Sequence, residues 1–254
     1  STPYEEMAAE PRKAGGSYYS YPWASELREG LKSTGVTTDL PPVQSEAPAG
    51  FKPVYISHYG RHGSRWLTDE WKYQLLVNVF DSLHTIQKLT PLGEDVRERL
   101  HKVYEDAEGR VGNLTEVGVA QHRGIAKRMI ANFPSLFAGN TFIEAKSSIK
   151  TRCIMSMMAF CESLKEVNPQ LVIAKEAAER YTYYINNKDF EPAAKKQKKL
   201  WIDDFHAYTN ENMPTDRLYG QLFTENPFSD RVAEIKFGDA MYWVAENMQD
   251  TTCE

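Results

Sequence analysis

A histidine set between two arginines is the part of this sequence with the clearest chemistry. Residues 57–65 read Ser-His-Tyr-Gly-Arg-His-Gly-Ser-Arg, so that Arg61 and Arg65 lie on either side of His62. Two guanidinium groups held in one turn repel each other unless an anion lies between them, and the planar guanidinium matches two oxygens of phosphate. The two glycines of the stretch let the backbone approach the same anion closely. This pattern predicts a phosphate-binding turn.

His62 is predicted to be a neutral nucleophile. Both neighbouring arginines disfavour its imidazolium form, so the ring should stay uncharged at physiological pH. A neutral imidazole that faces a bound phosphoryl group can attack phosphorus. The role of His58 is open, although a histidine near a strand end is more often packed and hydrogen-bonded than catalytic. His84, His101 and His122 lie on predicted helices and carry no motif.

Strands and helices must hold this turn in place. The apolar run Val54-Tyr55-Ile56 predicts a strand over about residues 51–58, and a strand that ends in a Gly-flanked turn presents its side chains at the carboxyl edge of a sheet, where α/β folds bind ligands. Thr115, which precedes Glu116, predicts the start of a helix that runs to about Phe133.

A second arrangement of the same kind follows in the chain. Residues 141–145 predict a short strand, and after a polar turn a helix is expected from about Thr151, with Arg152 in its first turn. An arginine at a helix N-terminus predicts a second anion-binding position, since helix N-termini attract anions. Taken alone, Arg152 would be an ordinary salt-bridged arginine.

Two further helices are predicted between these segments, and helical spacing of apolar residues indicates which side of each is buried. One helix should begin after Thr68 and the other at Thr90-Pro91. The residues expected to face the core are Trp71, Leu75 and Val79 in the first helix, Leu92, Val96, Leu100 and Val103 in the second, and Ile154, Met158 and Cys161 in the helix that carries Arg152.

These motifs resemble those of a known family. Arg61-His62-Gly63-Ser64-Arg65 resembles the signature of the histidine phosphatase superfamily, specifically of its histidine acid phosphatase and phytase branch, and the longer string from Ser57 resembles bacterial multiple inositol polyphosphate phosphatases. Leu114-Thr115-Glu116-Val117-Gly118 resembles the Leu-Thr-x-x-Gly block of that branch. Arg152, followed by Ser156 and Phe160, matches its second arginine block.

The resemblance implies an α/β fold, a three-layer sandwich with a mostly parallel central sheet and an inserted helical cap domain. Residues 1–50 would form a leader packed on the core, residues 51–177 the amino-terminal part of the phosphatase core, and residues 178–254 the helical cap. The lysine run at 195–199 falls within this cap. It is interpreted mainly as a solvated helix face, from which one or two lysines could still reach a highly phosphorylated substrate.

The function implied by the resemblance is hydrolysis of phosphomonoesters, with inositol polyphosphates such as phytate as the favoured substrates. His62 would attack phosphorus and form a phosphohistidine, while Arg61, Arg65 and Arg152 hold the phosphate oxygens. No metal and no cofactor is expected, because the arginines supply the positive charge. Two alternatives stay open: a phosphomutase of the same superfamily, and a truncated, non-catalytic module that binds phosphorylated ligands.

One part of the family pattern is not found in the sequence. Members of the branch carry a second histidine and a proton donor near the carboxyl end, as His-Asp or His-Ala-Glu. His206-Ala207-Tyr208 begins like the second form but has tyrosine in place of the acid, and we interpret it as a coincidence. The carboxyl-terminal part of the core is therefore expected to be absent, and the chain to be part of a longer protein.

Composition limits the remaining classes of function. The chain of 254 residues is 41% hydrophobic and has a formal net charge of -5, which argues against non-specific binding of nucleic acid. No apolar run reaches the length of a membrane span, and the three cysteines have no metal-like spacing. We expect a small phosphorylated substrate as the partner and a secreted or periplasmic mature form. The oligomeric state stays open.

Overall fold

The computed structural model describes residues 2–11, 47–185 and 191–248, and it has an α/β fold. The chain divides into two compact units, each of which combines segments that are distant in sequence. Unit 1 contains the described residues up to Arg65 together with residues 113–185, and unit 2 contains residues 66–112 and 191–248. The predicted α/β class is confirmed.

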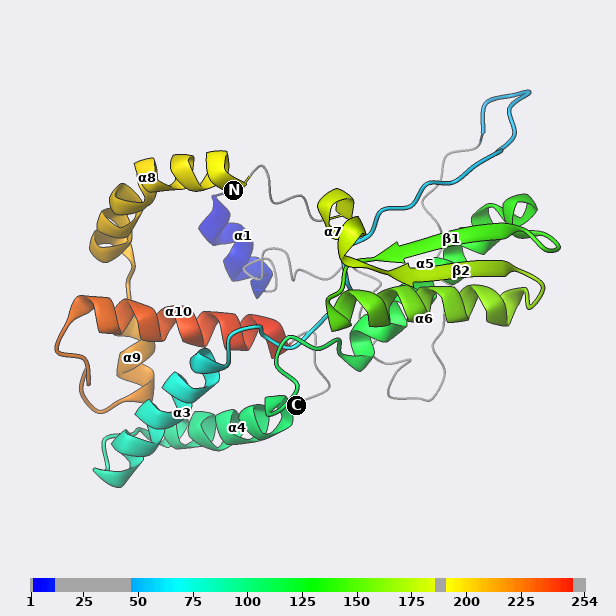
Figure 1. The fold of residues 1–254 in the computed structure, drawn as a ribbon. Helices are drawn as coiled ribbons and strands as arrows, with labels where there is room; N and C mark the ends of the chain where they lie inside the picture. Colours follow the sequence, from blue (N-terminus) through cyan, green and yellow to red (C-terminus); the bar gives the residue numbers. More distant parts are fainter. Residues whose placement is uncertain (1, 12–46, 186–190, 249–254) are drawn as a thin grey trace. The chain divides into compact units, whose positions relative to one another are not determined.

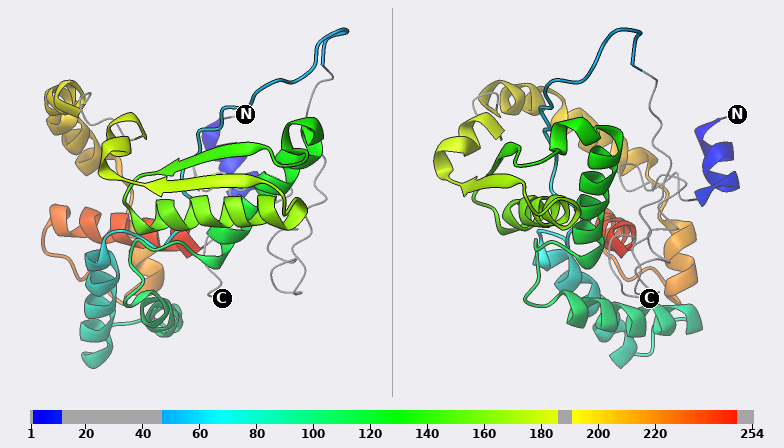
Figure 2. Two further views of the ribbon diagram at one scale, coloured as in Figure 1. Left: turned by 45° about the vertical axis from the view of Figure 1, so that its right-hand side comes forward. Right: turned by 90° about the vertical axis from the view of Figure 1, so that its right-hand side faces the viewer.

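Unit 1 contains a parallel pair of strands, β1 (Phe142–Ser147) and β2 (Val172–Ala177). They pair in register from Phe142 opposite Val172 to Ser147 opposite Ala177, and helix α6 (Thr151–Val167) connects them. Figures 1 and 2 show α6 running along this sheet. The strand predicted at 141–145 and the helix predicted from Thr151 are both found. β2 was not predicted, although the apolar run that begins at Leu171 could have indicated it.

Helix α5 (Glu116–Asn132) packs against α6 and completes the core of unit 1. The hydroxyl of Thr115 accepts a hydrogen bond from the backbone N–H of Gly118, which confirms the predicted helix start. The short helices α1 (Pro3–Ala9), η2 (Pro134–Phe137) and α7 (Glu179–Ile185) also belong to this unit. Its buried apolar centre is formed by Ala126, Phe137, Leu164 and Leu171, with Ile56, Ile143, Phe160 and Ile173 packed around them.

The strand predicted at 51–58 is not found. Residues 51–64 have no regular secondary structure, and Phe51, Val54 and Tyr55 are 75%, 79% and 80% exposed. The side chain that packs into the core of unit 1 is Ile56. A strand exists only when a neighbouring strand takes up its N–H and C=O groups, so an apolar run alone does not determine one. The prediction failed because it considered the run without its partner.

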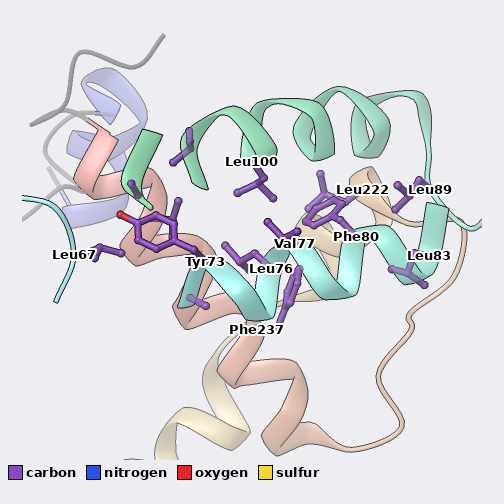
Figure 3. Packing of buried hydrophobic residues seen from close by; sticks show 14 of the residues in the cluster. Leu67, Tyr73, Leu76, Val77, Phe80, Leu83, Leu89, Leu100, Leu222 and Phe237 are labelled. Carbon is purple, nitrogen blue, oxygen red and sulfur yellow. The ribbon is translucent and has the colours of Figure 1, made fainter. Parts of the chain in front are cut away.

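Unit 2 is built from helices around one apolar cluster (Figure 3). Helices α3 (Glu70–Thr85) and α4 (Pro91–Ala107) pack with α9 (Asp216–Leu222) and α10 (Arg231–Asn247), and α8 (Glu191–Asn212) belongs to the same unit. Contacts among five aromatic rings, with centroids 5.0–6.4 Å apart, join these helices: Phe80, Tyr219, Phe223, Phe228 and Phe237.

The predicted helices are present, but several of their buried faces were placed wrongly. Trp71, Leu92 and Met158 are 40%, 46% and 41% exposed. In α3 the buried apolar residues are Tyr73, Leu76, Val77, Phe80 and Leu83. One residue corresponds to about 100° around a helix, so a small error in phase exchanges the buried face for an exposed one.

The two units do not follow the predicted domain boundary at residue 178. Residues 66–112, which the sequence assigns to the core, pack with the helices after residue 190, because α3, α4, α9 and α10 share one apolar cluster. Helix α7 belongs to unit 1. A functional division into leader, core and cap stays a prediction, and most of the leader, residues 12–46, lies outside the described residues.

Over the described part of the chain, no helix combines the length and the apolar character needed to cross a membrane. Lys195, Lys196, Lys198 and Lys199 lie on α8, and their side chains are outside the described part.

Candidate active site

The turn at residues 61–65 is held by hydrogen bonds from the two long helices of unit 1. The carbonyl oxygen of Ser64 accepts hydrogen bonds from the backbone N–H of Thr115 (2.9 Å) and from its hydroxyl (3.0 Å). The amide of Gln121 bonds both the backbone N–H and the hydroxyl of Ser64, each at 2.8 Å. On the other side, the N–H of Gly63 donates to Oγ of Ser156 in α6 (3.0 Å). The two helices predicted from sequence therefore position the turn, through the N-cap residue Thr115 and through side chains within the helices.

Gly63 and Gly118 allow the turn to lie directly against α5. A Cβ atom at Gly63 would lie 2.5 Å from the carbonyl oxygen of Gly118, and a Cβ atom at Gly118 would lie 2.3 Å from the carbonyl oxygen of Ser64. Both distances are too short for any side chain. The glycines are needed here because two backbone segments approach each other, which gives the Leu-Thr-x-x-Gly pattern a physical reason.

The ring of His62 is held in one tautomer. Its Nδ1 lies 2.8 Å from the carbonyl oxygen of Gly63. A carbonyl oxygen can only accept a hydrogen bond, so Nδ1 carries the proton and Nε2 of the neutral ring keeps its lone pair. The side chain is half-buried. Its free nitrogen therefore has the electronic form that a nucleophile requires.

The pKa of His62 is lowered from its ordinary value. Burial is the largest cause, and the positive charges of Arg152, Arg65 and Arg61 also lower the pKa, while the hydrogen bond to Gly63 opposes them. The neutral imidazole expected from the sequence agrees with this direction, although that expectation considered only the arginines. Desolvation contributes more than any of them.

We expect the ring of His62 to titrate below pH 6.5 in the folded protein, and the ring of His122, whose pKa is also lowered, to do the same. The unfolded chain binds more protons than the folded one below this pH, so stability present above pH 6.5 is lost as the pH falls through the folded pKa values. NMR titration of the ring C–H resonances, assigned with His62→Ala and His122→Gln, measures the pKa of each ring. A midpoint at or above 6.5 for either ring would contradict the geometry.

The three predicted arginines all lie within electrostatic reach of His62. Arg61 is exposed, while Arg65 and Arg152 are half-buried. Arg65 also forms an isolated antiparallel bridge with Leu114, the residue that precedes Thr115. Arg152 is the second residue of α6, so backbone N–H groups at the start of this helix add to the positive potential. The structure thus brings together residues that are 91 positions apart.

His122 contacts the same turn, although no role was predicted for it from the sequence. It is 7% exposed on α5, and its Nε2 lies 3.1 Å from the carbonyl oxygen of Arg61. Its pKa is lowered by burial first and then by the nearby rings of His58 and His62. A sequence signal existed, since Thr115, Gly118 and His122 recur at helical spacing and so share one face of α5.

His58 is exposed, so the core position that we expected for it is not found. Its ring stacks on that of Phe160 in α6, with centroids 5.3 Å apart and planes 10° apart. The neighbouring Tyr59 donates its hydroxyl proton to the carbonyl oxygen of Ile185 at the end of α7. The residues just before the signature are therefore held by α6 and α7.

The other histidines of the described chain lie in unit 2 and have ordinary contacts. His84 pairs with Glu94 and His101 with Asp81, each at 2.8 Å. His206 lies exposed on α8 beside Phe205, which is consistent with reading the His-Ala-Tyr string as a coincidence. No group of three or more histidine, cysteine or acidic side chains able to hold a metal ion occurs within residues 2–11, 47–185 and 191–248.

No family model and no curated protein matches the chain. Among solved structures, the chain is similar to the crystal structure of the Bifidobacterium longum multiple inositol polyphosphate phosphatase in complex with inositol hexasulfate, with a TM-score of 0.52 and 20% sequence identity. The match covers 72% of this chain and 45% of that one, so the chain spans less than half the length of the protein it matches. The chain accordingly shares its fold, over this part, with a bacterial multiple inositol polyphosphate phosphatase.

Proposed function

We propose that this chain carries the nucleophilic half of a phosphatase site, which hydrolyses phosphomonoesters through a phosphohistidine at His62. The observation that supports the proposal most strongly is the state of the His62 ring. Its Nδ1–H donates to the carbonyl oxygen of Gly63, its Nε2 carries the lone pair, and the positive charges of three arginines act on it. A nucleophile next to fixed positive charge is the arrangement that phosphoryl transfer requires.

In the first step, Nε2 of His62 attacks phosphorus in line with the ester oxygen. The Nε2–P bond forms while the P–O ester bond breaks, and the leaving alkoxide takes a proton from a general acid or from water. Arg61, Arg65 and Arg152 bind the equatorial oxygens and stabilise the negative charge that is spread over them in the transition state. The carbonyl oxygen of Gly63 accepts a hydrogen bond from Nδ1–H of the ring throughout this step, and so stabilises the positive charge on the phosphorylated imidazole.

In the second step, water attacks the phosphohistidine. The new P–O bond forms, the Nε2–P bond breaks, and the electron pair returns to Nε2 as inorganic phosphate leaves. The neutral ring that results is the starting form, because Nδ1 keeps its proton in the bond to Gly63. The lowered pKa of His62 favours this return, since a protonated Nε2 could not attack again.

We propose inositol polyphosphates as the substrate class. Three arginines and a helix N-terminus in one site provide more positive charge than a single weakly charged phosphomonoester needs, although the chain as a whole is acidic. The resemblance of the signature to bacterial multiple inositol polyphosphate phosphatases supports the same class. So does the similarity in fold to one such protein, whose crystal structure contains inositol hexasulfate.

Purified protein is expected to release inorganic phosphate from inositol hexakisphosphate and to carry an acid-labile, alkali-stable phosphoryl group on the peptide that contains His62. Rapid quenching in alkali followed by peptide mass spectrometry measures the intermediate. Inositol hexasulfate serves as the matched control, because it presents the same array of anionic groups but no phosphorus to transfer. It should compete with the substrate without labelling the peptide.

The alternatives give different outcomes in the same assay. A phosphomutase would label His62 but return the phosphoryl group to the organic substrate, so that little free phosphate accumulates. A binding module would bind inositol hexakisphosphate in calorimetry, with neither label nor phosphate release. Either result would overturn the proposed hydrolysis.

A further inference from the structure

The backbone of the signature turn is fixed one peptide unit at a time. The unit that joins Gly63 to Ser64 is held at its carbonyl by His62 and at its N–H by Gln121. The unit before it is held at the N–H of Gly63 by Ser156. His122 holds the carbonyl of the next unit back, the one that joins Arg61 to His62.

The bond from His122 has a geometric consequence for the nucleophile. No cis peptide bond occurs in the described chain, and a trans peptide is planar, with its C=O and N–H pointing in opposite directions. Holding the carbonyl of Arg61 against α5 therefore directs the N–H of His62 away from α5. The same plane contains the Cα atoms of both residues, so its orientation determines where the side chains of Arg61 and His62 begin.

The side chain of His122 is suited to this task by its protonation state and its burial. Because a carbonyl oxygen only accepts, Nε2 of His122 must carry the proton in this bond. At 7% exposure the ring is shielded from water, which would otherwise compete for the carbonyl of Arg61. Burial and two neighbouring imidazoles keep it neutral, so it adds no positive charge beside the nucleophile.

We infer that His122 is a positioning residue, which orients the peptide between Arg61 and His62 so that the arginine and the nucleophilic ring meet the same phosphoryl group. The inference rests on the proposed function, which assigns the phosphoryl group to this site. It predicts that the donor at Nε2, and not the imidazole as such, is what the site requires. Changes at His122 should therefore affect the rate of the chemical step more than substrate capture.

Two substitutions separate the donor from the ring. His122→Phe keeps a flat ring of similar size and removes the donor, whereas His122→Gln places an amide N–H near the position of Nε2. Phenylalanine is expected to lower kcat for phosphate release by about 100-fold with a smaller change in KM, because a displacement near 1 Å at a reacting group costs about that much. Glutamine is expected to stay within a few-fold of the wild type.

Ser163→Ala is the matched control for the loss of a buried hydrogen bond. Ser163 in α6 is fully buried, and its hydroxyl donates to the carbonyl oxygen of Arg123 in α5 at 3.1 Å, a bond that is not one of those that hold the signature turn. This variant removes the same kind of bond between a side chain and a carbonyl. It should lower the thermal midpoint about as much as His122→Phe does and leave kcat unchanged.

Calorimetric binding of inorganic phosphate to the same four proteins separates this inference from the proposed function. Wild-type protein that binds phosphate but releases none from substrate would refute hydrolysis, while weaker phosphate binding by the Phe variant, restored in the Gln variant, would still support His122 as a positioning residue. A Phe variant with wild-type kcat and phosphate affinity, or a Gln variant as impaired as Phe, would overturn the inference. Wild-type protein that neither binds phosphate nor releases it would overturn both.

Discussion

Replacing His62 by alanine is expected to lower kcat for phosphate release from inositol hexakisphosphate by about 10⁴-fold or more, the scale seen when a covalent nucleophile is removed. Alanine cannot form the bond to phosphorus, so the two-step route is lost. The arginines remain, and KM should change much less than kcat. Steady-state kinetics, with the peptide label followed in parallel, measure both effects.

His84→Ala is the control for this experiment. His84 lies in unit 2 with half of its side chain exposed, and its contact with Glu94 is of the surface type that contributes little to stability. Its loss should leave kcat unchanged. If His62→Ala keeps more than a tenth of the wild-type rate, the nucleophile is another group and the assignment of His62 is wrong.

Gly118→Ala is expected to disrupt the site by pushing the signature turn away from α5. The new methyl group would lie 2.3 Å from the carbonyl oxygen and 2.9 Å from the nitrogen of Ser64. Both are backbone atoms that are held by further hydrogen bonds to Thr115 and Gln121, so they cannot move aside without breaking these bonds. Overpacking of this kind costs about 3 kcal/mol of unfolding free energy. The rate of phosphate release should also fall, because the turn that carries His62 is displaced.

The same helix provides a matched control in Gly124. A Cβ atom there would meet only the end of the flexible Arg128 side chain, at 3.0 Å. Alanine in place of glycine inside a helix stabilises it by about 1 kcal/mol, and both variants share this gain, so their difference isolates the clash. Denaturant unfolding and the phosphate assay, applied to Gly118→Ala and Gly124→Ala, measure this difference in stability and in activity. Equal stability and equal activity would mean that the turn does not lie against α5.

What the sequence allowed us to predict was local. The cap at Thr115, the start of α6 and the place of Arg152 in its first turn follow from a few adjacent residues, and they are confirmed. His62, Arg61 and Arg65 were predicted as site residues because their types and spacing are chemically unusual, and their roles stay a prediction. Each of these patterns is contained in a few adjacent residues of the chain.

What could not be predicted depended on partners far along the chain. The bond from His122 joins residues 61 positions apart, and a helical histidine gives no sign of which carbonyl it will reach. The strand expected at 51–58 lacks a neighbour among the described residues, although its apolar residues fit the pattern. The buried side of α3 was misplaced because it is set in part by α10, which follows more than a hundred residues later.

The two-part construction of unit 2 affects how the chain folds during synthesis. Thr90, at the start of α4, donates its hydroxyl proton to the carbonyl oxygen of Gln221, 131 residues later. At typical translation rates this interval lasts on the order of ten seconds, during which α3 and α4 have emerged but the helices that cover their apolar faces have not. The nascent chain therefore presents Leu76, Phe80 and Leu100 to its surroundings in that time. We expect a holding chaperone to bind these exposed apolar residues, and shortening the interval by circular permutation should raise the yield of folded protein.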